Sequence, residues 1–110
     1  MDRHLPSRLT VSVRDHPEAA LRVWQLECEP PGGDHPDSTA ACAVLAELAD
    51  PFAPVPPSAV CAQVYHGPER ATIDGNWRGE PVHAIYTRTD ACQNRRWQQL
   101  AAVLQPQGET

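Results

Sequence analysis

The stretch RATIDGNWRGEPVHAIYTR, residues 70–88, reads as two strands joined by a turn. Its arms, residues 70–73 and 82–88, contain the threonine, isoleucine, valine and tyrosine that are typical of strands. Asp74-Gly75 lies between the arms, and an Asp-Gly pair is a strong short-range signal for a hairpin turn. The stretch therefore predicts an antiparallel pair of strands with its turn at Asp74-Gly75.

Two further strands are predicted upstream. Residues 9–14 alternate strictly between apolar and polar side chains, which is the pattern of a half-buried strand. Residues 20–28 carry apolar side chains on both faces, with Leu21 and Val23 on one side and Trp24 on the other. We therefore expect this second strand to lie centrally in a sheet or to be covered by a partner.

Two helices are predicted beside these strands. Ser38 is a helix-capping residue type, and apolar side chains recur at helical spacing from there to about Asp50, where Pro51 ends the pattern. Asp90 and the three residues after it have the form of a capping box, and a second apolar stripe follows as far as Leu104. Helices that do not alternate with the strands indicate an α+β fold.

Length and composition limit the class of protein. A chain of 110 residues forms one domain, which we expect over residues 6–105, after a disordered N-terminus (1–5) and before a polar tail (106–110). Twelve prolines argue against a helical bundle. A net charge of −5 without a single lysine disfavours nucleic acid, and no apolar run approaches the length of a membrane span. We expect neither partner.

The four cysteines are the main chemical signal. They are Cys28, Cys42, Cys61 and Cys92. None forms the close pair that zinc sites usually contain, whereas an even number in a small proline-rich chain predicts two disulfides and an oxidising compartment. The histidines share no ligand spacing, so no metal or other cofactor is expected. The given N-terminus lacks the apolar core of a signal peptide, so we expect either the mature form of a secreted protein, whose signal peptide is absent from the given chain, or a protein that stays in the cell.

Several segments, in order, resemble the Streptomyces subtilisin inhibitor family of secreted protease inhibitors. They are Pro6-Ser7-Arg8-Leu9, His35-Pro36, Val60-Cys61-Ala62-Gln63-Val64-Tyr65, Thr72-Ile73-Asp74-Gly75-Asn76-Trp77-Arg78-Gly79 and Asp90-Ala91-Cys92. The resemblance extends from about Pro6 to Leu104. It implies a single α+β domain with a five-stranded antiparallel sheet, two helices, the bridges Cys28–Cys42 and Cys61–Cys92, and a homodimer formed through the sheet.

The same resemblance implies a reactive bond between Gln63 and Val64. Gln63 then enters the main specificity pocket of a subtilisin-like serine protease. The other loop residues expected to contact the protease are Val60, Cys61, Ala62, Tyr65 and His66. Asp74, Trp77 and Asp90 are expected to support the loop from behind, in addition to their roles in the turn, in packing and as a helix cap.

The sequence departs from the family in three places. Gln63 is neutral where many members carry Met or Lys, so strong trypsin inhibition is not expected. Ala62 stands where proline is usual, which leaves the backbone freer. The C-terminal segment has helical spacing where the family has an aromatic-rich strand, so we expect a longer second helix or a short last strand over residues 102–104.

Two other functions remain open from the residues alone. An exposed Gln63 is suited to be the acyl donor of a transglutaminase, or the loop is a non-inhibitory ligand for another protein. Cys61 with His66 or His83 also has the residue types of a thiol nucleophile and its base. Two disulfides leave no such thiol, so we expect that the chain is not an enzyme.

Overall fold

The computed structural model describes residues 7–106 of the chain. The predicted disordered N-terminus and all of the predicted polar tail except Pro106 lie outside the described residues. Among the described residues, no helix has the length and apolarity needed to cross a membrane.

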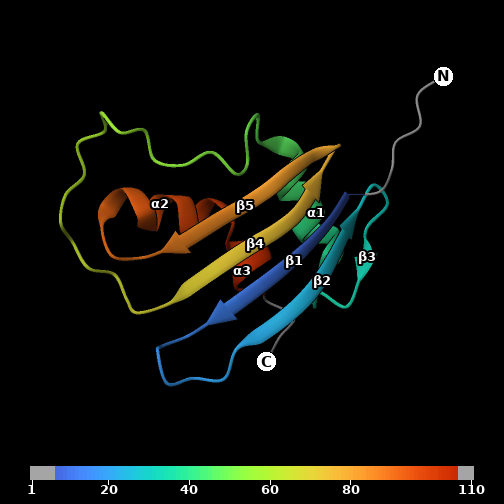
Figure 1. Cartoon of the computed structure of the whole chain (residues 1–110), viewed down its shortest axis with the longest axis horizontal. Coiled ribbons are helices and arrows are strands. Elements are labelled where there is room, and N and C mark those ends of the chain that lie inside the picture. The colour runs from blue at the N-terminus through green and yellow to red at the C-terminus, as the bar shows by residue number, and fades with distance from the viewer. Residues whose placement is uncertain (1–6, 107–110) are drawn as a thin grey trace.

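Five antiparallel strands form one sheet, in the order β3-β2-β1-β4-β5 (Figure 1). They are β1 (Ser7–Arg14), β2 (Arg22–Cys28), β3 (Gly32–Gly33), β4 (Arg70–Trp77) and β5 (Glu80–Thr87). This confirms the predicted five-stranded antiparallel sheet. β2 lies next to the short edge strand β3, which the sequence pattern did not show because two glycines carry no strand signal.

The β4–β5 hairpin exists, but its predicted turn at Asp74-Gly75 is wrong. Both residues lie inside β4, and the turn falls at Arg78-Gly79, where both φ angles are positive. Gly75 is required for a different reason. A Cβ at this position would lie 2.1 Å from the main-chain oxygen of Arg8 in β1, so the close approach of the two backbones excludes a side chain.

Helix α1 (Ser38–Glu47) begins at Ser38, the residue predicted as its cap, and ends earlier than predicted. Asp37, rather than Ser38, is the N-cap, and its carboxylate accepts a hydrogen bond from the main-chain nitrogen of Ala40 at 3.2 Å. The buried disulfide Cys28–Cys42 joins this helix to the end of β2, with 5.5 Å between the Cα atoms.

Helix α2 (Ala91–Gln99) begins at the predicted cap, because Asp90 accepts a hydrogen bond from the main-chain nitrogen of Gln93 at 2.8 Å. It is followed by the short helix α3 (Ala101–Leu104). The strand expected over residues 102–104 is therefore wrong, and the segment is helical as expected, although it is divided at Leu100 into two helices instead of forming one longer helix. Val103 and Leu104 are fully buried against the rest of the core, which explains the apolar spacing.

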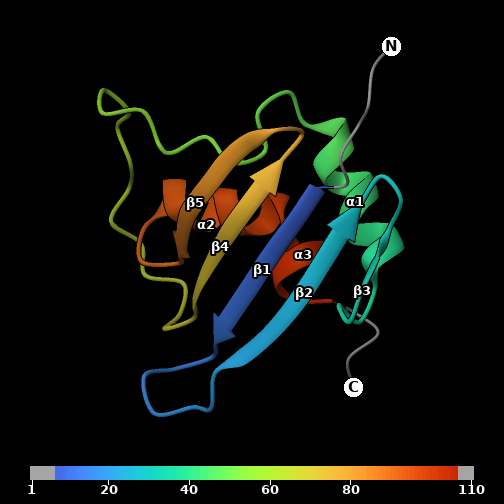
Figure 2. The same ribbon diagram turned by 45° about the vertical axis from the view of Figure 1, so that its right-hand side comes forward.

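The helices cover one face of the sheet (Figures 1 and 2), and the hydrophobic core lies between the two layers. The alternation predicted for residues 9–14 is confirmed, since Leu9, Val11 and Val13 are buried. The opposite face of the sheet carries exposed apolar side chains, among them Val23 at 47% and Ile85 at 42% of their full exposure. The molecule is thus a two-layer α+β domain with one uncovered sheet face.

Candidate functional site

A long exposed segment connects α1 to β4 and extends beyond the end of the sheet beside α2 (Figure 1). Its tip has no regular secondary structure. Val60, Val64 and Tyr65 retain 98%, 50% and 64% of their full exposure, and Ala62 and Gln63 are exposed as well. Exposed apolar side chains that cluster in one short segment are typical of surfaces that meet a partner. We refer to residues 58–66 as the exposed loop.

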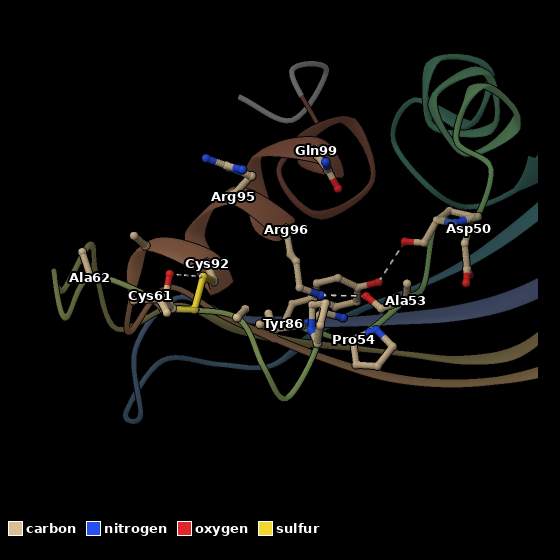
Figure 3. A pocket seen from close by; sticks show the side chains of 16 residues that line it. Asp50, Ala53, Pro54, Cys61, Ala62, Tyr86, Cys92, Arg95, Arg96 and Gln99 are labelled. Atoms are coloured by element: carbon tan, nitrogen blue, oxygen red, sulfur yellow. Dashed lines mark hydrogen bonds between the residues drawn. A yellow bond between two sulfur atoms is a disulfide. The ribbon is translucent and has the colours of Figure 1, made fainter.

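Two bonds attach the exposed loop to the first turn of α2. The disulfide Cys61–Cys92 brings the two Cα atoms to 5.4 Å. The main-chain nitrogen of Ala91 donates a hydrogen bond to the carbonyl oxygen of Ala62 at 3.0 Å. Figure 3 shows Cys61 and Ala62 beside the start of this helix. Both predicted disulfides are therefore present, and among the described residues no cysteine is free, which removes the thiol-nucleophile hypothesis.

Gln63 occupies the centre of a tight turn at the tip. The main-chain nitrogen of Val64 donates to the carbonyl oxygen of Ala62 at 2.9 Å, which closes a three-residue turn. The side-chain nitrogen of Gln63 donates to the carbonyl oxygen of Cys61 at 3.3 Å. The bond between Gln63 and Val64 therefore lies in this turn, directly after the two attachments to α2.

The loop is also held where it leaves the tip. His66 donates from its main-chain nitrogen to the carbonyl oxygen of Arg88, just after β5, at 2.8 Å. The attachments before the Gln63–Val64 bond therefore end on the first turn of α2, and the attachment after it ends on Arg88, in the short segment that joins β5 to α2.

The proline-rich segment leading to the loop is fixed by two residues that the sequence analysis did not select. Arg96 donates from Nε to the carbonyl oxygen of Ala53 at 3.0 Å, and its guanidinium lies 4.3 Å from the centre of the Tyr86 ring. The Tyr86 hydroxyl donates to the carbonyl oxygen of Pro51 at 3.4 Å. Figure 3 shows Arg96, Tyr86 and Ala53 together. These partners are distant in sequence, so no local pattern could have indicated them.

Burial has a measurable consequence at Tyr86. The side chain is almost completely buried, and this burial raises the pKa of the Tyr86 hydroxyl to about 12, because the phenolate would be poorly hydrated there. The nearby Arg96 guanidinium lowers the pKa only in part. Tyr86 therefore stays a neutral hydrogen-bond donor under the loop at ordinary pH.

A hollow of about 530 Å³ lies between the proline-rich segment, the loop and α2. Most of its lining consists of apolar side chains and the Tyr86 ring, with Arg95 and Gln99 at its margin (Figure 3). The loop therefore arches over the body of the domain and is bonded to it at Cys61, Ala62 and His66. Its shape depends on the attachments named above and on the limited backbone freedom of its prolines.

The three residues predicted to support the loop lie in different places. Asp90 caps α2 and lies close to Cys61 and Cys92. Trp77 is buried and packs edge-on against Phe52 of the segment leading to the loop, with 6.0 Å between the ring centres. Asp74 instead pairs with His83 of β5, about 13 Å along β4 from the end nearest the loop, so the structure does not bring it to the loop.

Comparison with known proteins accords with this geometry. The family model described as subtilisin inhibitor-like matches residues 5–94. The chain belongs to the subtilisin inhibitor-like family. Within this family it is 34% identical over 90 residues to the subtilisin inhibitor of Streptomyces violaceus, an alignment that covers 76% of this chain and 61% of that protein. It is 31% identical to subtilisin inhibitor-like protein 1 of Streptomyces cacaoi, over 82% of this chain and 88% of the relative.

A solved structure of the same kind is also similar. It contains sermetstatin of Streptomyces caespitosus in complex with Bacillus licheniformis subtilisin. The match has a TM-score of 0.50 and 27% identity, and it covers 90% of this chain and 91% of the other. The family named from the ordered motifs is thereby confirmed.

Proposed function

We propose that this chain inhibits subtilisin-like serine proteases by presenting the Gln63–Val64 bond as a substrate that is held in place. The observation that carries the proposal is the fixed, exposed loop in which this bond lies between attachments on both sides. The family membership and the similarity to a protein solved in complex with subtilisin support it.

The physical basis is the cost of ordering a peptide in a protease cleft. Proteases bind extended segments through main-chain hydrogen bonds while alternate side chains fill pockets. A free peptide loses conformational entropy on binding, whereas a loop that already has the bound shape avoids much of this loss. The exposed side chains of Val60, Val64 and Tyr65 are then available to the protease subsites next to Gln63.

In this proposal the nucleophile is the serine of the protease, and this chain supplies only the scissile bond. The carbonyl oxygen of Ala62 accepts a hydrogen bond from the main-chain nitrogen of Ala91. This oxygen therefore does not occupy the hydrogen-bond donors of the protease. The side chain at position 63 is left to determine specificity through the pocket that it enters.

Exchange of the side chain at position 63 tests the proposal. Wild-type chain is expected to inhibit subtilisin and to inhibit trypsin only weakly, and Gln63→Lys is expected to gain trypsin inhibition because the pocket of trypsin contains a carboxylate. Gln98→Lys, an exposed glutamine on α2, is the matched control and should gain nothing. Mass analysis of nicked chain should show cleavage between positions 63 and 64; cleavage elsewhere, or no gain with lysine, contradicts the assignment.

The transglutaminase hypothesis can be examined in the same samples. The amide of Gln63 is exposed but donates to the carbonyl oxygen of Cys61. Incorporation of a primary amine at Gln63 without any protease inhibition would favour the acyl-donor function over the one proposed here.

We also propose that two copies associate through the uncovered face of the sheet. Val23 of β2 and Ile85 of β5 are exposed there and Leu21 is exposed just before β2, and burying them would remove apolar surface from water. Val23→Asp is expected to convert a dimer into a monomer in sedimentation experiments, with inhibition retained because the loop lies at the end of the sheet. A monomeric wild-type chain would contradict this proposal.

Secretion is the remaining part of the proposed function. Two disulfides in a small domain are typical of proteins from oxidising compartments. An inhibitor of an extracellular protease would meet its partner in that compartment.

A further inference from the structure

Arg88 holds both ends of the short segment that follows the exposed loop. Its carbonyl oxygen accepts the hydrogen bond from the main-chain nitrogen of His66 at 2.8 Å. Its guanidinium Nη1 donates to Oε2 of Glu69 at 2.8 Å. Residues 66–69 are therefore attached to a single residue at their beginning and at their end.

The side chain of Arg88 is itself fixed. Its Nε donates to Oδ1 of Asn94, a buried residue of α2, at 2.8 Å. The Arg88 and Glu69 side chains retain only 21% and 19% of their full exposure, less than in the ion pairs Arg22–Asp15, Arg78–Glu29 and His83–Asp74. Burial shields this pair from salt and from competing water, so it restrains its partners more than a surface pair does.

Gly67 shows how closely the Glu69 carboxylate approaches this segment. A Cβ built at position 67 would lie 2.1 Å from Oε1 of Glu69. The carboxylate thus folds back against the main chain of Gly67, while Pro68 limits the rotation of the chain between them. A side chain at position 67 would have to displace the carboxylate.

The attachments on the two sides of Gln63–Val64 end on the same structural unit. Before the bond, Ala62 is attached to Ala91, and Cys61 to Cys92. After the bond, His66 and Glu69 are attached to Arg88. If the bond is cut, two residues separate the new amine of Val64 from its first attachment at His66. Short tethers of this kind keep a high effective concentration of one reacting group beside the other.

We propose that Arg88 is the positioning residue that keeps the amine of Val64 beside the acyl-enzyme, so that the cut bond is remade. The inference rests on the proposed function. When the bond is remade, the Val64 nitrogen attacks the carbonyl carbon of Gln63, which is esterified to the protease serine. The new C–N bond forms as the ester C–O bond breaks, and the protease histidine carries the amine proton to the serine oxygen.

The test compares wild type with Arg88→Met after incubation with a catalytic amount of subtilisin. The expected result is an increase in the equilibrium ratio of nicked to intact chain on the order of tenfold, because other attachments still hold part of the fragment. Resynthesis from nicked chain should slow by a similar factor. The association rate of intact variant should stay within about twofold of wild type, since the loop tip is unchanged.

Three further variants make the result specific. Glu69→Gln keeps the shape of the side chain and removes its charge, so it gives the same change if Arg88→Met does not fold. Arg88→Lys keeps the charge opposite Glu69 but loses the second branch to Asn94, and an intermediate value is expected. Arg78→Met removes the exposed ion pair with Glu29 at the other end of β4 and is the matched control.

Each outcome has one meaning. A role limited to stability would lower the Tm of the variants and leave the ratio of nicked to intact chain unchanged, and this result would overturn the inference. An unchanged ratio in folded Glu69→Gln beside an inhibitory wild type would overturn it as well, while leaving the proposed function intact. A wild-type chain that subtilisin neither binds nor cuts at Gln63–Val64 would overturn the proposed function and this inference together.

Discussion

The two disulfides of this molecule lie in contrasting surroundings. Cys28–Cys42 is buried between the sheet and α1, where apolar side chains surround it. Cys61–Cys92 is only half-buried, at the base of an exposed loop beside a hollow. The first bond joins two elements that also pack together, whereas the second restrains a segment with little packing of its own.

The comparison indicates that the two disulfides have different roles in this chain. The chain-entropy model assigns about 3 kcal/mol to the 14-residue separation of the buried bridge and about 3.7 kcal/mol to the 31-residue separation of the other. The two contributions to stability are therefore similar. The two bridges differ in their effect on the exposed loop, because only Cys61–Cys92 restrains its shape.

Removal of the half-buried bridge should have the largest effect on inhibition. Cys61→Ser with Cys92→Ser leaves the loop to be ordered by the protease, and fixing two more backbone residues costs about 2–3 kcal/mol. This corresponds to roughly 100-fold weaker binding, with faster cleavage between positions 63 and 64. The inhibition constant and the rate of nicking are the measurements.

Removal of the buried bridge is the control. Cys28→Ala with Cys42→Ala should lower the free energy of unfolding by about 3 kcal/mol, measured by denaturant unfolding. At temperatures where this variant is still folded, its inhibition constant should match that of wild type. Equal loss of inhibition in both double variants would break the distinction between the two regions.

Alkaline pH should weaken the support under the loop. The pKa of Tyr86 is raised from 10.0 to about 12 in the folded chain, so the folded state holds this proton more tightly than the unfolded state. The corresponding stability is complete below pH 10 and is lost as the pH rises through about 12. Unfolding free energies of wild type and Tyr86→Phe should therefore converge over this interval. A constant difference between them would contradict the role given to burial.

The smallest expected effect concerns the backbone just before the proposed reactive bond. Ala62→Pro removes freedom from the unbound loop, a change that contributes about 0.4–1 kcal/mol where the backbone fits proline. Inhibition should then strengthen by roughly two- to fivefold. The gain should be larger in the variant without Cys61–Cys92, where the loop is less restrained. Weaker inhibition in both backgrounds would show that the backbone at position 62 is incompatible with proline.

Local patterns in the sequence predicted the elements of this fold well. Alternation identified β1, and capping chemistry at Asp90 identified the start of α2. The hairpin turn was misplaced because Gly75 has the residue type of a turn, although its position is dictated by the backbone of β1. That cause is a contact between strands that lie far apart in the chain.

The candidate site was predicted only in part, for a similar reason. The resemblance implied both bridges, which the structure contains, and assigned the reactive bond to Gln63–Val64, which lies in the exposed loop and remains a proposal. Arg88 and Arg96 were not predicted, because they act through partners distant in the chain. Arg88 binds the carboxylate of Glu69, 19 residues away, and Arg96 binds the carbonyl oxygen of Ala53, 43 residues away. Their neighbours in sequence are equally polar, so nothing set them apart before the fold was known.

The attachments of the exposed loop do not involve its outward-facing side chains. The carbonyl of Ala62, the amide of His66 and the sulfur of Cys61 carry the restraint, and none of these depends on which side chain stands at positions 60, 64 or 65. Substitutions at these three positions can therefore redirect the chain from one protease to another while its folding stability remains nearly constant. Such a molecule can change its target protease with little effect on the stability of the rest of the domain.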